Sequence, residues 1–568
     1  MNDKAQDLIA VATGWIEADP DPHTAATVQS LVDRTAGGGE GADAAAADLA
    51  DLFGGRIAFG TAGLRAAIGP GPTQMNRLVV RQTTAGLMRW LPEGSKVVIG
   101  FDARHGSTQF AAEAAEVVAA CGGIAELLPG PLPTPVLAHA VLARSAAAGV
   151  MITASHNPPQ DNGYKLYLDD GIQLVSPDDA AIAAAIDEVA ANDPAVELVE
   201  QPDRIHVLGD DVAAGHIRAA ISTLAGSARQ VRTVYTAMHG VGGAHLLRAF
   251  EAAGFPAPAV VPEQFDPDPD FPTAAFPNPE EAGALDLAVA LAGELGADLV
   301  LANDPDADRL ALAVPSRQGS SVVALSGDQI GVLLADHLLR SGVAVDHAGG
   351  RVVANSVVSS RLLSRMAAAD GVDAVTTLTG FKWVARPIVE RPEQHYLLGY
   401  EEAIGYCVGG VVRDKDGISA ALVAAEMVAA LLERGLTVWD RLDALAIEHG
   451  LHLTAPVTIR FDGPQGNVER EQVMGRFVDQ PPSHLDGIER TDWLDLSAGE
   501  QFPPTTGIIA NYGSTRVIVR PSGTEPKLKA YIEVIEPVAD SADLERARRS
   551  GGERLQRVQD EISGVLGS

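Results

Sequence analysis

Short apolar runs and longer amphipathic stretches alternate along most of the chain. The run KVVIGF at residues 96–101 is followed by a loop and then by residues 108–123, where apolar side chains line one face of a helix that ends in glycine. The same order recurs in RTVYTAMHGVGGAHLLRAFEAAG and in GRVVANSVVSSRLLSRMAAADG. These three strand–loop–helix openings, near residues 97, 233 and 352, predict three related α/β domains with mainly parallel, mixed sheets.

The last part of the chain has a different pattern. A β-like run, LHLTAPVTIRFD, precedes a polar helix-like stretch, and TRVIVR and LKAYIEVIE then lead to a charged C-terminal helix. This order predicts a smaller α+β domain. We expect boundaries near residues 206, 325 and 450, which gives four domains at 1–205, 206–325, 326–450 and 451–568, arranged around a central cleft.

The composition favours a folded protein of the cytoplasm. A chain of 568 residues is too long for one hydrophobic core, and its hydrophobic fraction is 46%. Two separate cysteines, Cys121 and Cys407, suggest neither a disulfide framework nor a metal cluster. The first residues do not resemble a secretory signal, and the apolar stretch at 420–432 is too short to cross a bilayer and contains a glutamate.

The charge excludes two classes of partner. A formal net charge of −33 repels nucleic acid and anionic lipid, so we expect neither as a partner. Basic residues that gather in a few loops of so acidic a chain are therefore expected to hold an anion.

The stretch GVMITASHNPPQDNGYKLY ends an apolar run at Ser155 and His156. A serine at this place commonly caps a helix, but Pro158 and Pro159 oppose a helix that starts at once. The Ser–His pair also suggests an acyl hydrolase. No G-x-S-x-G elbow surrounds the serine, and neighbours in an extended segment point to opposite sides, so His156 is predicted to be poorly placed to take the serine proton.

Three carboxylates follow a second apolar run in LVLANDPDADRLAL. Asp304, Asp306 and Asp308 alternate with small or rigid residues and can converge on a hard divalent cation. A calcium loop of the EF-hand type would need glycine and glutamate where Arg309 and Pro315 stand. Three oxygen ligands with open coordination positions therefore fit Mg²⁺ that also binds a phosphate oxygen, and Arg309 could reach the same phosphate. A solvated acidic turn without a cation is the alternative interpretation.

Several further loops suggest phosphate or sugar binding, each weakly when taken alone. In VIVRPSGTEPKLKAY a guanidinium, two hydroxyls and a glycine make a plausible phosphate cradle without a Walker motif, and a basic turn is the alternative. The segment EQFDPDPDFPTAAFPNPEEAG at 263–283 predicts a stiff, irregular excursion. The other loops are GTAGLR with Arg65, TGFKW with Lys382, GYEEAIGY with Glu401 and Glu402, and RDKDG with Arg413 and Lys415.

TASHNPPQDNGYK, DPDADR, GYEEAIGY and RPSGTEP occur in this order in four successive predicted domains. With these motifs the chain, from about Phe59 to its C-terminus, resembles the α-D-phosphohexomutase superfamily of phosphoglucomutases and phosphomannomutases. Within it, YTAMHGVG, FPNPEE and EEAIGY are most similar to the branch with phosphopentomutase-like and glucose-1,6-bisphosphate-forming members.

The resemblance implies a role for each matching residue. Ser155 would carry the transferred phosphoryl group and, with Asp304, Asp306 and Asp308, would bind Mg²⁺. Lys165, Arg65 and His156 would flank the reaction centre, and the general base stays open among them. The implied substrate-binding residues are Arg309, Gly380, Lys382, Glu401, Arg413, Lys415, Arg520, Ser522, Gly523 and Thr524.

The implied activity is a mutase that interconverts hexose 1- and 6-phosphates through a phosphoserine and a sugar 1,6-bisphosphate. Many hexose-phosphate members carry serine where this chain has Ala403, so the sugar preference stays open. A phosphopentomutase, a sugar-bisphosphate synthase and a non-catalytic sugar-phosphate binder are the alternatives. The expected partners are small sugar phosphates, and the expected assembly is a monomer or homodimer.

Overall fold

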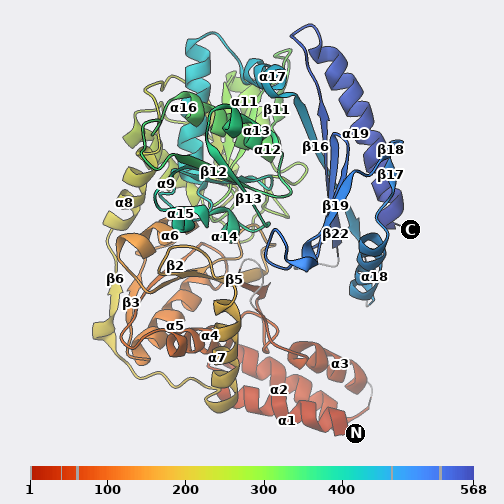
Figure 1. Cartoon of the computed structure of the whole chain (residues 1–568). Coiled ribbons are helices and arrows are strands. Elements are labelled where there is room, and N and C mark those ends of the chain that lie inside the picture. Colours follow the sequence, from red (N-terminus) through yellow and green to blue (C-terminus); the bar gives the residue numbers. More distant parts are fainter. Residues whose placement is uncertain are drawn as a thin grey trace. The chain divides into compact units, whose positions relative to one another are not determined.

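The computed structural model of the chain describes residues 3–39, 41–58, 63–461, 463, 465–522 and 527–567. Contacts divide the chain into two compact units. The first comprises Met1–Ala324 with Gly405–Ala425, and the second comprises Leu325–Ile404 with Glu426–Ser568. Figure 1 colours the elements of both units along the sequence.

A six-stranded sheet, in the order β1-β5-β4-β2-β3-β6, forms the centre of the first unit. β2 is parallel to β3 and β4, and β5 returns antiparallel to β4, so the predicted mixed sheet is confirmed. β6, near the expected boundary at 206, still pairs with β3. The strands are β1 (Leu64–Ala67), β2 (Lys96–Phe101), β3 (Ile124–Leu127), β4 (Ala148–Ile152), β5 (Asp161–Leu168) and β6 (Ile205–Val207).

Helices cover both faces of this sheet, which explains the unbroken apolar runs of β2 and β4. Val97 and Ile99 point into one core, whereas Val98 and Met151 point into the core on the other face. The first core is completed by α4 (Arg77–Trp90), α5 (Ser107–Ala120) and α7 (Asp178–Asn192), and the second by α6 (Thr134–Ala143) and α8 (Asp211–Ile221).

Three helices at the N-terminus, in red in Figure 1, extend the first of these cores. They are α1 (Asp3–Ala18), α2 (Pro22–Gly37) and α3 (Ala42–Phe53). Trp15, Val28 and Leu49 are buried in the same cluster as Leu78 of α4. Our sequence analysis identified no helix here, since the alanine-rich stretch lacks a clear apolar period.

The second sheet of the first unit follows the order β11-β10-β9-β7-β8. β7 is parallel to β8 and β9, and β10 folds back antiparallel to β9. A Cβ at Gly240, after β7, would lie 2.3 Å from Cα of Pro305, so the loop after β9 can approach only because residue 240 is glycine. The elements are β7 (Thr233–Thr236), α9 (Gly242–Ala253), β8 (Ala259–Val260), α10 (Pro262–Phe265), α11 (Asp286–Leu295), β9 (Leu299–Ala302), β10 (Ala311–Pro315) and β11 (Val322–Ala324).

The proline-rich segment is irregular, as predicted. Residues 266–285 contain no helix and no strand after α10 ends. The unit also contains β15 (Gly405–Val408) and the beginning of α16 (Gly417–Glu433). Across the described ranges, the helices lack the combination of length and apolar character that crossing a bilayer requires.

In the second unit, β12 pairs in parallel with both β13 and β14. This arrangement confirms the third strand–loop–helix opening near residue 352. The elements are α12 (Gly327–Arg340), β12 (Arg351–Ser356), α13 (Leu362–Ala369), β13 (Asp373–Thr377), α14 (Phe381–Val384), α15 (Pro387–Glu390), β14 (His395–Glu401) and α17 (Val438–His449).

The C-terminal part is an antiparallel sheet in the order β16-β22-β21-β20-β19, so the predicted α+β domain is confirmed. Its apolar face packs against two helices, α18 and α19, of which α19 lies along the sheet in Figure 1. The elements are β16 (Leu451–Arg460), α18 (Gly466–Asp479), β17 (His484–Leu485), β18 (Ile488–Glu489), β19 (Asp492–Asp495), β20 (Ile508–Tyr512), β21 (Thr515–Pro521), β22 (Lys527–Glu536) and α19 (Leu544–Gly567).

Candidate active site

The loop after β4 presents Ser155. Because β2 and β4 are parallel, the loops that follow them lie at the same edge of the sheet. Ser155 adopts a φ of 52°, in the left-handed region that a non-glycine residue rarely occupies. Its backbone N–H donates to Oγ1 of Thr153 over 2.8 Å, and the residue is 2% exposed. The serine is therefore held in an unusual backbone conformation at the end of a buried strand.

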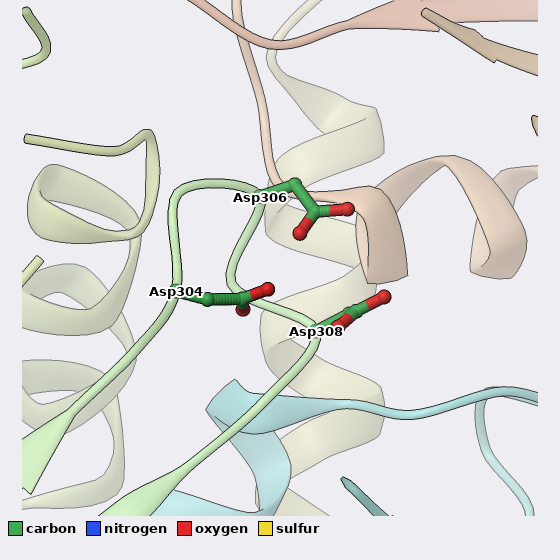
Figure 2. Close-up of side chains that lie close together, drawn as sticks. All are labelled: Asp304, Asp306 and Asp308. Carbon is green, nitrogen blue, oxygen red and sulfur yellow. The ribbon is translucent and has the colours of Figure 1, made fainter. Parts of the chain in front are cut away.

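The hairpin loop between β9 and β10 carries the three aspartates. One oxygen of each carboxylate lies within 4.8 Å of one oxygen of the other two, and all three residues are buried. Figure 2 shows the carboxyl groups of Asp304, Asp306 and Asp308 projecting to the same side of this loop. Between them Ala307 has a φ of 54°, which makes the sharp turn that brings the side chains together. The arrangement is not that of a solvated surface turn, because no carboxylate faces bulk water.

The serine loop and the aspartate loop meet within the first unit. Oγ of Ser155 donates to Oδ2 of Asp304 over 2.7 Å, although 149 positions separate the two residues. Lys165 on β5 donates from Nζ to Oδ2 of Asp306 over 2.6 Å and to Oδ2 of Asp308 over 2.8 Å. Serine, lysine and three carboxylates thus form one buried polar cluster.

Charge attraction and burial compete in this cluster. Burial disfavours the ammonium group, but Asp306 and Asp308 outweigh it and raise the pKa of Lys165. Burial also disfavours the charged form of Asp308, yet Lys165 and Lys415 lower its pKa overall. Burial together with repulsion from its two neighbours raises the pKa of Asp304 well above its usual value. Asp304 is therefore repelled by its two acidic neighbours, a condition that a divalent cation relieves.

The donor set fits Mg²⁺. Oδ1 of Asp306 and Oδ1 of Asp308 are buried and lack a hydrogen-bond donor among the described residues. A buried carboxylate oxygen without a partner is costly, and hard oxygen ligands are those that Mg²⁺ prefers. The two unpartnered oxygens, the carboxylate of Asp304 and the Ser155 hydroxyl beside it can therefore hold this ion.

The expected orientation of His156 is wrong. Nδ1 of His156 lies 3.2 Å from Oγ of Ser155, within hydrogen-bonding distance. Side chains do not alternate here, because the left-handed φ of Ser155 takes this residue out of the extended conformation. Burial, and then the charges of Arg309 and Arg65, lower the pKa of His156 well below its ordinary value. The imidazole is therefore neutral beside the serine hydroxyl.

Four further predicted site residues of the first unit are basic. Arg65 on β1 donates from Nη1 to Oδ1 of Asn157 in the serine loop over 3.2 Å. The backbone N–H of Arg309 donates to Oδ1 of Asp304 over 3.0 Å, and Nζ of Lys415 lies 3.2 Å from Oδ2 of Asp308. The fourth, Arg413, lies two residues before Lys415, and its guanidinium donates to the carbonyl of Asp170 over 2.7 Å. Arg65, Arg309 and Lys415 therefore lie where their charges act on the acidic loop, as an anion-binding site requires, whereas the described contact of Arg413 is with Asp170.

The remaining predicted residues belong to the second unit. Gly380, with a φ of 113°, donates from its backbone N–H to Oε1 of Glu401 over 2.7 Å, and Lys382 lies two residues later on α14. Oε2 of Glu402 instead accepts from the hydroxyls of Ser356 and Ser359. The two adjacent glutamates therefore have different partners, and Glu401 accepts from the backbone of the residue that precedes α14.

Arg520 lies near the end of β21, and its charge acts on Tyr531 of β22. Burial raises the pKa of this tyrosine, which keeps its hydroxyl protonated. The backbone N–H of Ser522 donates to the carbonyl of Lys527 over 2.8 Å, closing the two ends of the loop. Gly523 and Thr524 lie outside the described residues.

Sequence reasoning missed two residues that contact the site. Oγ1 of Thr134, at the start of α6, donates to Oδ2 of Asp306 over 2.6 Å. Arg104, in the loop after β2, donates to the backbone of the serine loop. A buried-strand run followed directly by the charged pair in FDAR was the available signal for Arg104, whereas the LPTP stretch gives no sign of the threonine's role.

Comparison with known proteins agrees with this geometry. Four models of the phosphoglucomutase/phosphomannomutase family match the chain: alpha/beta/alpha domains I, II and III at residues 56–193, 214–318 and 326–446, and the C-terminal domain at 491–561.

Relatives match over nearly their whole length. A Haemophilus influenzae protein named "probable phosphomannomutase" is 41% identical over 86% of this chain and 98% of its own. The phosphopentomutase of Mus musculus is 35% identical over 97% of this chain and 93% of its own. A crystal structure of a phosphoglucomutase/phosphomannomutase family protein from Burkholderia thailandensis shares the fold, with a TM-score of 0.65 at 20% identity over 89% of this chain and 98% of that one. The chain therefore belongs to the phosphoglucomutase/phosphomannomutase family of the α-D-phosphohexomutase superfamily, and it is a phosphosugar mutase, an isomerase with a four-domain α/β fold.

Proposed function

We propose that the chain interconverts hexose 1-phosphates and hexose 6-phosphates, of glucose, mannose or both, through a phosphoserine at Ser155 and a sugar 1,6-bisphosphate. One observation carries the proposal. Oγ of Ser155 lies 2.7 Å from Asp304 in a buried cluster that joins the serine loop, Lys165 and three carboxylates. A serine held beside a cation site and basic side chains is suited to phosphoryl transfer, which depends on positioning and on neutralising charge.

In the proposed reaction the phosphorylated Ser155 reacts with a hydroxyl of the sugar monophosphate. The bond between serine oxygen and phosphorus breaks while a bond from the sugar oxygen to phosphorus forms, and the hydroxyl proton passes to a base. The resulting bisphosphate turns over and returns its other phosphoryl group to Ser155, which regenerates the phosphoserine. The site is used twice per cycle, so no phosphate is gained or lost.

Residues of the first unit carry the chemistry. When bound, Mg²⁺ supplies positive charge that polarises the transferring phosphoryl group, and Asp304, Asp306 and Asp308 would hold it. Lys165 adds a buried ammonium group that its carboxylate neighbours keep protonated. His156, with Nδ1 3.2 Å from the serine oxygen, is in reach to accept or return a proton.

Other basic and polar residues would bind the substrate. Arg65 and Arg309, which flank the serine and aspartate loops, would stabilise the phosphoryl group in transfer. Gly380, Lys382 and Glu401 would orient the sugar, since a carboxylate oxygen accepts hydrogen bonds from sugar hydroxyls. The residues proposed to hold the phosphate that does not react are Arg413, Lys415, Arg520, Ser522, Gly523 and Thr524.

A phosphopentomutase is the second candidate. The mouse phosphopentomutase aligns with 97% of this chain, and Ala403 replaces a serine common in hexose-phosphate enzymes. A sugar-bisphosphate synthase would use the same phosphoserine. A non-catalytic binder is disfavoured, because the serine, the three aspartates and the lysine are all present and in contact. We place the enzyme in the cytoplasm, a reducing compartment in which Cys121 and Cys407 would remain free thiols, as they are here.

A parallel assay tests the proposal. Purified protein with Mg²⁺ and a sugar 1,6-bisphosphate as activator is given glucose-, mannose-, ribose- and deoxyribose-1-phosphate, and product is followed for each. Ser155→Ala should lower turnover by at least about 10⁴-fold, because the acceptor oxygen is gone. Ser222→Ala is the control, since this exposed hydroxyl only donates to a carbonyl at the end of α8.

Intact-protein mass spectrometry supplies the second readout. The wild type should gain one phosphate after incubation with the bisphosphate, and Ser155→Ala should gain none. Turnover on none of the four sugars would refute the mutase, and wild-type turnover by Ser155→Ala would refute the nucleophile. Ala403→Ser should raise the ratio of hexose to pentose kcat/KM by about tenfold if residue 403 contacts the sugar.

A further inference from the structure

Arg104 lies in the loop after β2 and is only 4% exposed. Its guanidinium donates to four backbone carbonyls, all of them in or next to the serine loop. Nη2 donates to the carbonyls of Ser155 over 2.6 Å and Asn157 over 2.5 Å. Nη1 donates to the carbonyls of Pro158 over 2.8 Å and Asp161 over 3.2 Å. One planar cation therefore spans the loop from the nucleophile to the start of β5.

Two other side chains fix Arg104 in place. Nε of Arg104 lies 3.4 Å from Oδ2 of Asp102, while Oδ1 of Asp102 accepts from the backbone N–H of Arg104 and from the hydroxyl of Ser107. The ring of Phe271 lies 4.9 Å from the guanidinium carbon, in a cation–π contact. Phe271 comes from the irregular proline-rich segment at 263–283, to which the proposed function gives no role.

The serine loop needs such support. Ser155 has a left-handed φ, a strained conformation that persists only where its surroundings enforce it. Turn hydrogen bonds from Asn157 to Ala154 and from Asp161 to Pro158 do not involve the Ser155 carbonyl. That carbonyl accepts from Arg104, so the guanidinium opposes relaxation of the strained residue.

We propose that Arg104, braced by Asp102 and Phe271, is the positioning residue that holds Ser155 in the conformation required for phosphoryl transfer. This inference rests on the proposed function, since it assigns Arg104 a role at the same serine. Arg104 does not contact the hydroxyl of Ser155; it acts through the backbone. A lysine at this position should substitute only in part, because a single ammonium group cannot reach four carbonyls at once.

Kinetics of three variants test the role. Arg104→Ala should lower kcat by about 100-fold with KM for the sugar phosphate changed by less than about threefold, because the nucleophile and not the substrate is displaced. Arg104→Lys should lose about tenfold, and Phe271→Leu about threefold, in kcat. The last two keep a charge or an apolar side chain at the site, so they test the role even if Arg104→Ala does not fold.

Arg144→Ala is the matched control. Arg144 is also an arginine of the first unit that donates two hydrogen bonds to one carboxylate, that of Glu126, but it does not contact the serine loop. Its removal costs an ion pair and should leave kcat within about twofold of the wild type. A loss of kcat in Arg104→Ala beyond that of Arg144→Ala therefore exceeds the effect of removing an arginine–carboxylate ion pair.

Rescue by added guanidinium separates positioning from damage. Millimolar guanidinium should restore at least about tenfold of the activity of Arg104→Ala and should leave Arg144→Ala unchanged, because the ion can occupy the space of the missing side chain. Kinetics of Arg104→Ala matching those of Arg144→Ala, or the absence of rescue, would overturn the proposal.

Hydrogen exchange keeps this test independent of the proposed activity. Amide exchange in a peptide covering residues 153–164 should be faster in Arg104→Ala than in the wild type by about tenfold, with peptides from the second sheet unaffected. Unchanged exchange in that peptide would refute the bracing role itself. If the exchange increases but the wild type shows no mutase turnover or phosphoserine, the proposed function fails while the contact of Arg104 with the loop stands.

Discussion

Two buried acidic groups, one in each unit, differ in how their oxygens are satisfied. Glu533 on β22 is 2% exposed, and its Oε1 accepts from the hydroxyl of Ser360, the backbone N–H of Arg361 and Nδ1 of His452. Its Oε2 accepts from Nε of Arg361 over 2.6 Å and lies 3.2 Å from Arg516. In the aspartate loop, by contrast, Asp306 and Asp308 each keep one buried oxygen without a donor.

The difference separates a structural carboxylate from a functional one. Burial raises the pKa of Glu533, but His452, Arg516 and Arg361 lower it by more, so the net shift is downward. This carboxylate is therefore ionised and stabilised by the fold alone. Burial and the charges of Asp306 and Asp308 instead raise the pKa of Asp304, so the ionised form of this carboxylate is unfavourable until a cation binds. A carboxylate such as Glu533 connects structural elements, whereas carboxylates such as those of the aspartate loop are suited to bind a ligand.

The largest effect that distinguishes the two regions is on activity. Asp304→Asn removes a charged ligand of the proposed Mg²⁺ site and should lower kcat by about 1,000-fold. The free energy of unfolding without Mg²⁺ should change by less than about 1 kcal/mol, since weaker repulsion offsets a weaker hydrogen bond. Mutase assays and urea unfolding measure both. A large loss of stability with activity retained would place Asp304 with the structural carboxylates.

The opposite result is expected for Glu533→Gln. Removing this charge leaves Arg361, Arg516 and His452 without their shared partner, and should cost about 3 kcal/mol of stability. The activity of the folded fraction should stay within about threefold of the wild type. Urea unfolding followed by hydrogen exchange in peptides of β21 and β22 reports the change. Asp298→Asn serves as the control, because its partner Arg232 is largely exposed and the pair should contribute less than about 1 kcal/mol.

Local pattern was sufficient to predict most of the fold. The buried parallel strands β2, β7 and β12 read as short valine-containing runs followed by helical periodicity. The three N-terminal helices were missed because alanine, which dominates α3, gives little contrast between a buried and an exposed face. The strand β5 was missed as well, since NGYKLY mixes polar and apolar residues and is buried only because of what packs around it.

The site residues were predictable where the functional side chains lie close together in the sequence, within a single loop. Three alternating aspartates indicate a cation whatever their surroundings, and Ser155 was marked by the prolines after it. Arg104 could not be predicted in the same way, because its role depends on carbonyl groups that every residue possesses. The orientation of His156 depends on one backbone angle at Ser155, which the residue types around it do not determine.

Metal binding should sharpen the comparison by stabilising only one of the two regions. Mg²⁺ at 100 times its Kd should raise the free energy of unfolding of the first unit by about 2.7 kcal/mol, since it binds the folded carboxylate cluster. The increase should vanish in Asp306→Asn, which lacks one of the unpartnered oxygens, and should persist in Glu533→Gln. Thermal unfolding with and without EDTA measures the shift. An equal increase in Asp306→Asn would place the ion elsewhere.

Acid should act on His245 and Glu533 over different pH ranges, because both groups have lowered pKa values in the folded chain but different pKa values when unfolded. His245 on α9 is 3% exposed and its Nε2 lies 2.9 Å from Nδ1 of His216. Burial, and then His216, lower the pKa of His245 from 6.5 to about 3, against attraction from Asp416 and Asp210; Arg248 lowers it further. Below pH 6.5 His245 is protonated in the unfolded chain but stays neutral in the folded chain. The free energy of unfolding therefore falls as the pH drops below 6.5.

At pH 5 His245 alone should lower the free energy of unfolding by about 2 kcal/mol relative to neutral pH. The stability that Glu533 contributes should persist until the pH falls below 4.5, the pKa of this glutamate in the unfolded chain. Between pH 6.5 and 5, hydrogen exchange should therefore accelerate in peptides of α8 and α9. Burial also lowers the pKa of His452 beside Glu533, so a smaller acceleration is expected in the second unit. His245→Asn should flatten the pH dependence of the first unit, and Glu533→Gln should leave it unchanged in this window. If stability depends on pH equally in the wild type and in His245→Asn, a group other than His245 causes the loss in acid. The contrast between the two units would then lie in the carboxylates alone.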